Sequence, residues 1–185
     1  MSRIDESRPF IPVSFAVLTV SDTRSLEEDK SGATLAGRIE AAGHQLKARA
    51  ICTDDVEKIR AQVLDWSKDD GIDAIITTGG TGFTGRDVTP EALEPLFDKR
   101  MDGFSAVFQR ISYDKIGTST IQSRATAGLI HQTFVFVLPG SPGACKDAWD
   151  GILEGQFDYR HMPCNFVEIM PRLDEHLKRG SGKAV

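Results

Sequence analysis

Short segments typical of β-strands alternate in this chain with segments whose apolar residues recur every three or four positions. Residues 14–21, 74–78 and 133–138 are apolar runs, and residues 44–51 alternate polar and apolar side chains. Parallel strands need a helix-length connection, so this alternation predicts a mostly parallel sheet with helices on both faces. The expected fold class is a three-layer α/β domain, in which ligands bind at the carboxyl ends of the strands.

Three of the expected helices follow residues that can cap free backbone amides. Ser31, Asp54 and Thr89 are the predicted N-caps, and Glu57 completes a capping box with Asp54. This capping role would explain Asp54 without any role in chemistry. The apolar positions expected on the helices are Leu35, Ile39 and Ala42, then Val56, Ile59, Val63 and Trp66, then Phe104, Val107, Phe108 and Ile111.

The chain length predicts one domain. A chain of 185 residues matches an ordinary single domain, and it contains no internal repeat and no linker. Residues 1–12 and 179–185 lack an apolar period, so we expect them to be flexible extensions. The folded domain is predicted to cover residues 13–178.

The charge balance and the apolar runs exclude several classes of partner. The 22 Lys and Arg residues are outnumbered by 27 Asp and Glu residues, which argues against nucleic acid as a main partner. No apolar run approaches the ~20 residues that cross a bilayer, and the N-terminus has no secretory signal. We therefore expect a cytoplasmic protein with reduced cysteines, at least two of the three in the core, which are Cys52, Cys145 and Cys164.

A glycine-rich loop after the third strand is the densest functional signal. Successive glycines between residues 79 and 85 let a backbone approach an anion closely, which suits a phosphate ligand. The spacing also satisfies a loose dinucleotide-binding pattern, as in a nicotinamide oxidoreductase. That interpretation is disfavoured, because the loop follows the third strand and Pro90 delays the next helix.

Acidic residues accompany this loop. Asp87 would repel a phosphate ligand unless a cation lay between them, so it suggests a Mg²⁺ bridge to nucleotide phosphates. The alternative is that Asp87 stabilises its own turn. Asp54 and Asp22 follow two other strands at the same expected edge. Each is open to a role in a site or to a structural role, which is the helix cap for Asp54 and loop formation for Asp22. Another loop at this edge, residues 139–143, could receive a second anionic group.

Several motifs together resemble the MoaB/MogA family of molybdenum cofactor biosynthesis. The likeness runs from about residue 11 to residue 166 and includes residues 78–82, 86–91 and 139–141. Residues 160–166 are similar to the tail of the MoaB branch. The resemblance implies a molybdopterin-binding α/β domain that forms a homotrimer or homohexamer, and a possible role beside other proteins of the pathway.

The resemblance also implies an activity and a set of site residues. Active members are adenylyltransferases that use Mg²⁺ and ATP, and Asp54 and Asp87 match their two essential acids. Asp87 would also be the Mg²⁺ ligand. The residues implied in binding molybdopterin and nucleotide are Ser21, Asp22, Asp29, Ser31, Gly32, Gly79, Gly80, Thr81, Gly82, Pro139, Gly140 and Ser141.

Two points keep a second function open. Thr53 stands where active adenylyltransferases usually carry proline, although the acid that follows is retained. Some MoaB-branch proteins lack activity, so the alternative is a catalytically silent molybdopterin-binding or scaffold protein. Phe104 and Phe108 fit either the core or the subunit interface that the resemblance implies.

Overall fold

The structure is a computed structural model that describes residues 3–175, without the side chain of Arg3. Its main sheet has the strand order β3-β2-β4-β7-β6-β5, and a two-stranded sheet pairs β1 with β8. Strands β3, β2, β4 and β7 are parallel, and β6 runs antiparallel to both of its neighbours. The strands are β1 (Arg3–Ile4), β2 (Ser14–Val20), β3 (Gln45–Cys52), β4 (Ala74–Thr78), β5 (Lys99–Arg100), β6 (Thr126–Ile130), β7 (Thr133–Leu138) and β8 (His161–Met162).

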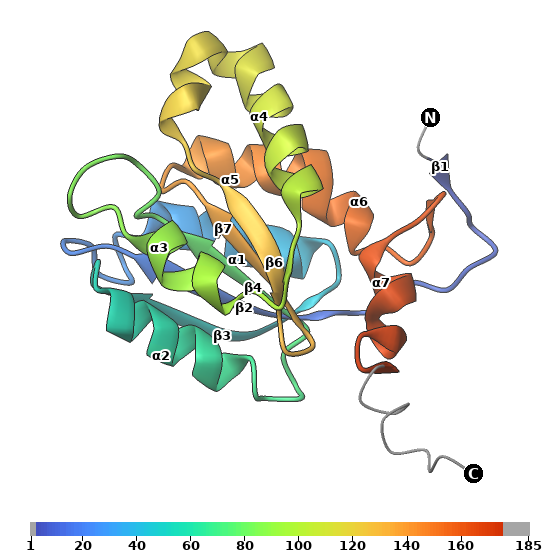
Figure 1. Ribbon diagram of the computed structural model, residues 1–185. Helices are drawn as coiled ribbons and strands as arrows, with labels where there is room; N and C mark the ends of the chain where they lie inside the picture. The colour runs from blue at the N-terminus through green and yellow to red at the C-terminus, as the bar shows by residue number, and fades with distance from the viewer. Residues whose placement is uncertain (1–2, 176–185) are drawn as a thin grey trace.

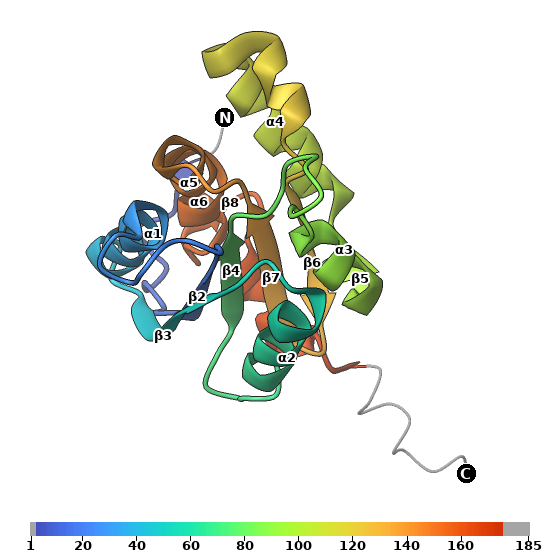
Figure 2. The ribbon, with the colours of Figure 1, turned by 90° about the vertical axis from the view of Figure 1, so that its left-hand side faces the viewer.

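Helices cover both faces of the sheet (Figure 1). Figure 2 shows α1 and α5 on one face and α2 on the other. The α-helices are α1 (Lys30–Ala41), α2 (Val56–Trp66), α3 (Thr89–Leu93), α4 (Asp102–Ile116), α5 (Pro142–Ala148), α6 (Glu154–Gln156) and α7 (Phe166–Ile169). Shorter helical segments are the 3-10 turns η1 (Glu94–Leu96), η2 (Gly117–Gln122) and η4 (Met170–Arg172), and the π-helical turn η3 (Trp149–Leu153).

Alternate residues of the strands supply two hydrophobic cores. In β2, Phe15 and Val17 face the core beneath α1, α4 and α5, whereas Ala16 and Leu18 face the core beneath α2 and α3. Both faces of the central strands are therefore buried, as expected for a parallel sheet. The predicted three-layer α/β class is confirmed. Phe104 and Phe108 are buried in the core beneath α1, α4 and α5, so the first of the two roles considered, that of core residues, applies.

One strand of the main sheet that was not predicted from the sequence is β6. β6 is a five-residue segment, Thr126–Ile130, that returns from β7 as an antiparallel neighbour. The tight turn between them is completed by His131, whose φ is +55°. A short segment interrupted by a glycine has no clear period, so the alternation of strands and helices concealed this pair.

The three predicted N-caps were wrong by one or two residues. Asp29 caps α1, with its carboxylate accepting from the Gly32 amide at 2.9 Å. Asp55, which has an extended backbone, caps α2 in place of Asp54. Thr89 is the first residue of α3 and makes no cap bond there. Consecutive polar residues have similar capping propensities, so the sequence could not decide between neighbours, and the structural explanation of Asp54 is removed.

The N-terminal segment is packed against the domain from residue 3, in contrast to the predicted flexible extension 1–12. β1 pairs with β8, and Arg8 lies 4.8 Å from the centroid of the Tyr159 ring. Backbone pairing and a cation–π contact need no apolar period, so no local pattern in the sequence indicates them. The predicted tail 179–185 lies outside the described residues.

The cysteines are free thiols in different surroundings. Cys145 is buried, Cys52 is half-buried and Cys164 is exposed, so only Cys145 is a full core residue. Burial raises the pKa of Cys145 and of Cys52 to about 11, which keeps both protonated at neutral pH. Within residues 3–175, no helix has the length and apolar character needed to cross a membrane.

Candidate functional site

The predicted site residues gather at the carboxyl ends of the parallel strands, which we call the carboxyl edge of the sheet. β2, β3, β4 and β7 are parallel, so their carboxyl ends meet there, and the chain crosses from β3 over β2 to reach β4. This places the reversal of strand order between β2 and β4, which is where open α/β sheets bind ligands. The loops after β2, β3, β4 and β7 supply every residue of the predicted site except Ser31 and Gly32, which lie in the first turn of α1.

Gly79 and Gly80 hold the start of the glycine loop against β2. Gly79 has φ +107°, and a β-carbon there would lie 2.2 Å from the Val20 carbonyl oxygen. Gly80 has φ +63°. Thr89 fixes the turn, because its hydroxyl donates to the Gly79 carbonyl at 2.8 Å and its amide donates to the Gly80 carbonyl at 3.0 Å. Only glycine fits this conformation and this close approach.

Gly79→Ala is expected to destabilise the protein by at least about 2 kcal/mol, because it combines a left-handed backbone with a clash against β2. Thermal unfolding measures this as a fall in Tm of roughly 4–8 °C for a chain of this size. Gly85→Ala is the matched control, since a β-carbon at Gly85 would meet nothing within 4 Å. Equal melting temperatures for Gly79→Ala and wild type would contradict this description of the loop.

Asp54 presents a half-buried carboxylate to the glycine loop. A β-carbon at Gly80 would lie 2.9 Å from Asp54 Oδ1, so the two residues are in direct contact. Burial raises the pKa of Asp54, and the negative charge of Asp22 raises it further. Among the described residues no Lys, Arg or His forms an ion pair with Asp54, because the nearby Arg86 is paired with Asp22. Asp54 is thus a partly desolvated acid without a cationic partner.

Asp22 and Arg86 join the loops after β2 and β4. The Arg86 guanidinium donates from Nε and Nη2 to the two Asp22 carboxylate oxygens, both at 2.8 Å. Asp22 Oδ1 also accepts from the Asp54 amide at 3.1 Å. The hydrogen bonds from Arg86 lower the pKa of Asp22. Asp22 is therefore ionised, and the charge of Arg86 balances its own, whereas Asp54 has no such ion pair.

Asp87 closes the far end of the glycine loop. Its Oδ2 accepts from the Thr84 amide at 2.9 Å and from the Thr84 hydroxyl at 2.6 Å. These bonds from Thr84, together with one from the Gly82 amide, lower the pKa of Asp87. The turn-stabilising role considered from the sequence is present. A carboxylate has about four lone-pair positions, so this role leaves Asp87 able to accept a further ligand.

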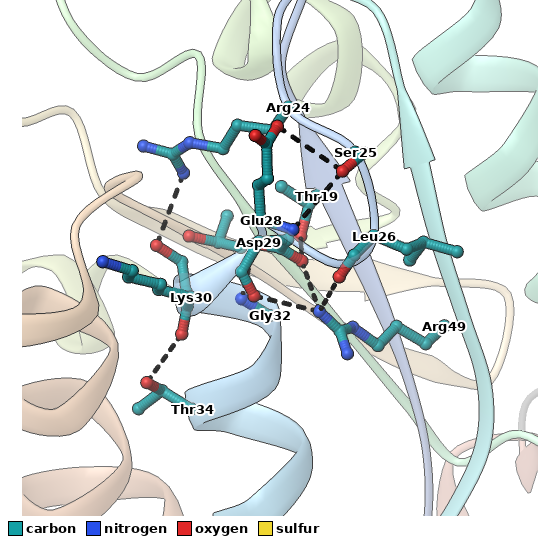
Figure 3. A network of polar contacts seen from close by, with 12 residues as sticks. Thr19, Arg24, Ser25, Leu26, Glu28, Asp29, Lys30, Gly32, Thr34 and Arg49 are labelled. Atoms are coloured by element: carbon teal, nitrogen blue, oxygen red, sulfur yellow. Dashed lines mark hydrogen bonds and ion pairs between the residues drawn. The ribbon is translucent and has the colours of Figure 1, made fainter.

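Asp29 lies at the start of α1 in a buried polar network (Figure 3). Its carboxylate accepts from the Thr19 hydroxyl at 2.7 Å and from Arg49 Nη2 at 2.9 Å, in addition to capping α1. Burial acts to raise the pKa of Asp29, but the bonds from Thr19, Gly32 and Arg49 outweigh it, and the pKa is lowered. The Asp29 carboxylate is fully buried, so it supports the loop before α1 and does not face a ligand, in contrast to its predicted binding role.

The start of α1 and the loop after β7 are tied together. The Ser31 hydroxyl donates to the Gly140 carbonyl at 2.8 Å, and Arg24 Nη1 donates to the same oxygen at 3.2 Å. Ser141 caps α5 by accepting from the Ala144 amide. These contacts place residues 139–141 beside α1. The two anion-binding loops expected from the sequence also meet, because the Gly79 amide donates to the Leu138 carbonyl at 3.0 Å and the Thr78 hydroxyl donates to the Pro139 carbonyl at 2.9 Å.

Asp22, Asp54 and Asp87 do not by themselves form a complete set of metal ligands. Among residues 3–175, no group of three or more His, Cys, Asp and Glu side chains is arranged to hold a metal ion. Asp54 and Asp87 nevertheless fit Mg²⁺ bound with a nucleotide, because Mg²⁺ takes one or two protein carboxylates and completes its shell with phosphate oxygens and water. The carboxylate of Asp54, which lacks a cationic partner, is the observation that supports this fit.

A cavity of about 920 Å³ lies elsewhere, between α4, η3 and α7. It contains none of the predicted site residues. Two of its three lining acids, Asp150 and Asp158, are already paired with Arg38 and Arg160, and the third is Glu154. The predicted acids and loops gather at the carboxyl edge of the sheet, which is therefore the candidate site.

The parallel sheet, the glycine loop and the acids at its carboxyl edge define the chain as an α/β domain of the ligand-binding, doubly wound class. Residues 16–158 match the family model described as the probable molybdopterin binding domain, so the chain belongs to this family of molybdenum cofactor biosynthesis proteins. The predicted membership is confirmed.

Curated relatives and solved structures agree with this assignment. The chain is 47% identical over 160 residues to molybdenum cofactor biosynthesis protein B of Escherichia coli K12, covering 86% of this chain and 94% of the relative. A crystal structure of molybdenum cofactor biosynthesis protein B is similar with a TM-score of 0.78 and 36% identity over 93% of this chain and 99% of the other. The tungsten cofactor synthesizing protein MoaB from Pyrococcus furiosus gives a TM-score of 0.68 and 32% identity, over 92% and 98%.

Several residues that hold the site were missed. Thr19 and Arg49 support Asp29, Thr84 orients Asp87, and Arg124, which lies just before β6, contacts the glycine loop. Thr84 could have been found, because a threonine three residues before an aspartate is a common turn partner. The others lie far from their partners in sequence, and no local pattern marks them.

Proposed function

We propose that this protein binds molybdopterin and adenylylates it with Mg-ATP. The terminal phosphate oxygen of molybdopterin attacks the α-phosphorus of ATP and forms a new P–O bond. The bond from the α-phosphorus to the bridging oxygen breaks, and pyrophosphate leaves. The products are adenylylated molybdopterin and pyrophosphate. The observation that carries the proposal is Asp54, a half-buried acid without a cationic partner beside a glycine loop.

The residues of the chain have distinct tasks in this reaction. Asp54 and Asp87 hold Mg²⁺, which neutralises charge on the phosphates when it is bound. The backbone of Gly79–Gly82 gives a phosphate group close access to amide groups, since these positions carry no side chain beyond Thr81. Catalysis of phosphoryl-type transfer depends mainly on alignment of two anions and on charge neutralisation, so no side-chain nucleophile is required.

A turnover assay tests the proposal. The purified protein is incubated with molybdopterin, ATP and Mg²⁺, and adenylylated pterin and pyrophosphate are separated by chromatography. We expect both products in equal amounts, and neither when Mg²⁺ is replaced by a chelator. Molybdopterin that co-elutes with the protein without product would instead support the silent binding or scaffold function, which the MoaB-like residues 160–166 and Thr53 favour.

The pH dependence of this reaction is expected to report Asp54. Because burial and Asp22 raise its pKa, Asp54 loses its charge at a higher pH than an ordinary aspartate, and kcat/KM should fall with it as pH decreases. Asp22→Asn removes a negative charge that raises the pKa of Asp54, and it releases Arg86 from its ion pair. The decrease in kcat/KM should therefore occur at lower pH than in the wild type. The comparison of the two proteins is the test, since substrate phosphates titrate near pH 6. Identical profiles would contradict the assignment.

We also propose self-association, as the family resemblance implies. Four apolar side chains on α4 and η2 are exposed in the subunit, and a partner subunit would cover them. Sedimentation velocity should give a trimer or a hexamer for the wild type and a smaller species for Ile116→Asp. A monomeric wild type would refute this part of the proposal. The exposed residues are Val107, Tyr113, Ile116 and Ile121.

A further inference from the structure

Arg124 precedes β6 and Asp54 follows β3, and these strands lie on opposite flanks of β4, the strand that leads into the glycine loop. Arg124 lies two residues before β6, far in sequence from the loop. Its backbone amide and its Nε both donate to the Thr81 carbonyl, each at 3.2 Å. Its Nη2 donates to the Asp87 carbonyl at 3.0 Å. One side chain therefore binds the first and last residues of the segment 81–87.

The guanidinium is itself held in place. Nη1 forms an ion pair with Glu91 on α3, and the guanidinium carbon lies 5.2 Å from the centroid of the Phe83 ring. Phe83 is 71% exposed at the tip of the loop, so Arg124 is the partner that covers part of its ring. A planar fork with donors at fixed spacing can bind two carbonyl groups and stack on a ring at once, which a lysine cannot do.

The interior of the same segment depends on Asp87. Its carboxylate binds Thr84 and Gly82, so the fold of the loop and the direction of this carboxylate are coupled. Residues 83–86 are exposed and contribute little apolar burial. Bonds to the two ends of the loop are thus a main constraint on where the Asp87 carboxylate lies relative to the sheet.

We propose that Arg124 is a positioning residue for Asp87, which fixes the 81–87 loop in the geometry that the transfer reaction uses. Arg124 acts through the loop and has no contact of its own with the substrates. The inference rests on the proposed function for its effect on turnover. Its effect on the loop can be measured without turnover.

The test compares Arg124→Met with Arg100→Met. Arg100 is a matched control, because it is an exposed arginine on β5 that pairs with Glu94 and touches no residue of the loop. Hydrogen exchange followed by mass spectrometry reports the amides of residues 81–87, including the Thr84 amide bonded to Asp87. Steady-state kinetics gives kcat and KM for both substrates.

We expect Arg124→Met to speed exchange in the loop by about tenfold or more and to lower kcat by about 10- to 100-fold, with little change in either KM. Arg124→Lys keeps the charge but not the fork, so it should restore only part of kcat and only part of the slow exchange. Arg100→Met should match wild type in each measurement.

Two results would overturn the inference. One is loop exchange in Arg124→Met that equals wild type. The other is a kcat that falls together with melting temperature equally in both Arg124 variants, which would indicate a structural role alone. If Arg124→Met does not fold, loop exchange and kcat of Arg124→Lys decide the question. If wild type makes no product, the proposed function fails, and the exchange measurement still supports or refutes the role of Arg124 in the loop.

Discussion

If the proposed function holds, Asp54→Asn is expected to reduce the turnover of molybdopterin adenylylation by about 100-fold or more, because it removes one of the two carboxylates that we propose hold Mg²⁺ at the phosphates. Asp54 has no cationic partner of its own and lies against Gly80, so it is available to a metal-bound nucleotide. Initial rates of pyrophosphate release at saturating Mg-ATP measure the effect directly.

The neighbouring residue provides the control for this experiment. Asp55 caps α2 by accepting from the Lys58 amide at 3.0 Å, and asparagine caps helices about as well as aspartate. Asp55→Asn should therefore keep wild-type turnover and stability, although it removes the same charge one position away. Similar losses in the two variants would mean that the net charge of this loop matters, and not the carboxylate of Asp54.

Asp29→Ala is expected to destabilise the fold by about 3–5 kcal/mol, the largest stability effect in the site. The substitution leaves Arg49 without its buried partner and removes the cap of α1. Arg49 Nε already has no hydrogen-bond partner, and Nη2 would keep only the backbone carbonyls of Leu26 and Asp29, at 3.4 and 3.0 Å. Urea unfolding followed by circular dichroism measures the change. Asp150→Ala, which breaks the more exposed pair with Arg38, should cost about 1 kcal/mol or less.

The stability supplied by Asp29 should depend on pH in a defined direction. The pKa of Asp29 is lower in the folded protein than in the unfolded chain. Its contribution is therefore complete above the unfolded value near 4 and is lost as pH falls through the folded value. The difference in unfolding free energy between wild type and Asp29→Ala should narrow below about pH 4. A difference that grows in acid would contradict the network.

The sequence predicted the part of the fold that local patterns encode. β2, β4 and β7 are buried on both faces and are short apolar runs, and β3 alternates because it lies at the sheet edge. Their carboxyl ends carry the predicted loops because parallel strands share one edge. The antiparallel β6 was missed, since its position depends on pairing with β7 and not on a period of its own.

The predicted site residues also gathered where the sequence placed them, but the sequence could not assign their roles. Asp54 and Asp55 are chemically identical neighbours, and only the extended backbone of Asp55 makes it the cap of α2. Asp29 was expected in the cleft and is buried. Arg86 and Asp22 pair across 64 positions, and Arg124 reaches the loop from 37 positions beyond Asp87. Such contacts follow from the topology of the sheet and leave no local pattern.

The fate of the α-phosphate of ATP distinguishes adenylyl transfer from binding alone. The protein is incubated with molybdopterin and Mg-ATP labelled either at the α-phosphate or at the γ-phosphate, and the label is followed by chromatography. We expect α-label in the pterin product and γ-label in pyrophosphate, with both lost in Asp54→Asn. Molybdopterin that binds to the protein while all α-label stays in ATP would contradict adenylyl transfer.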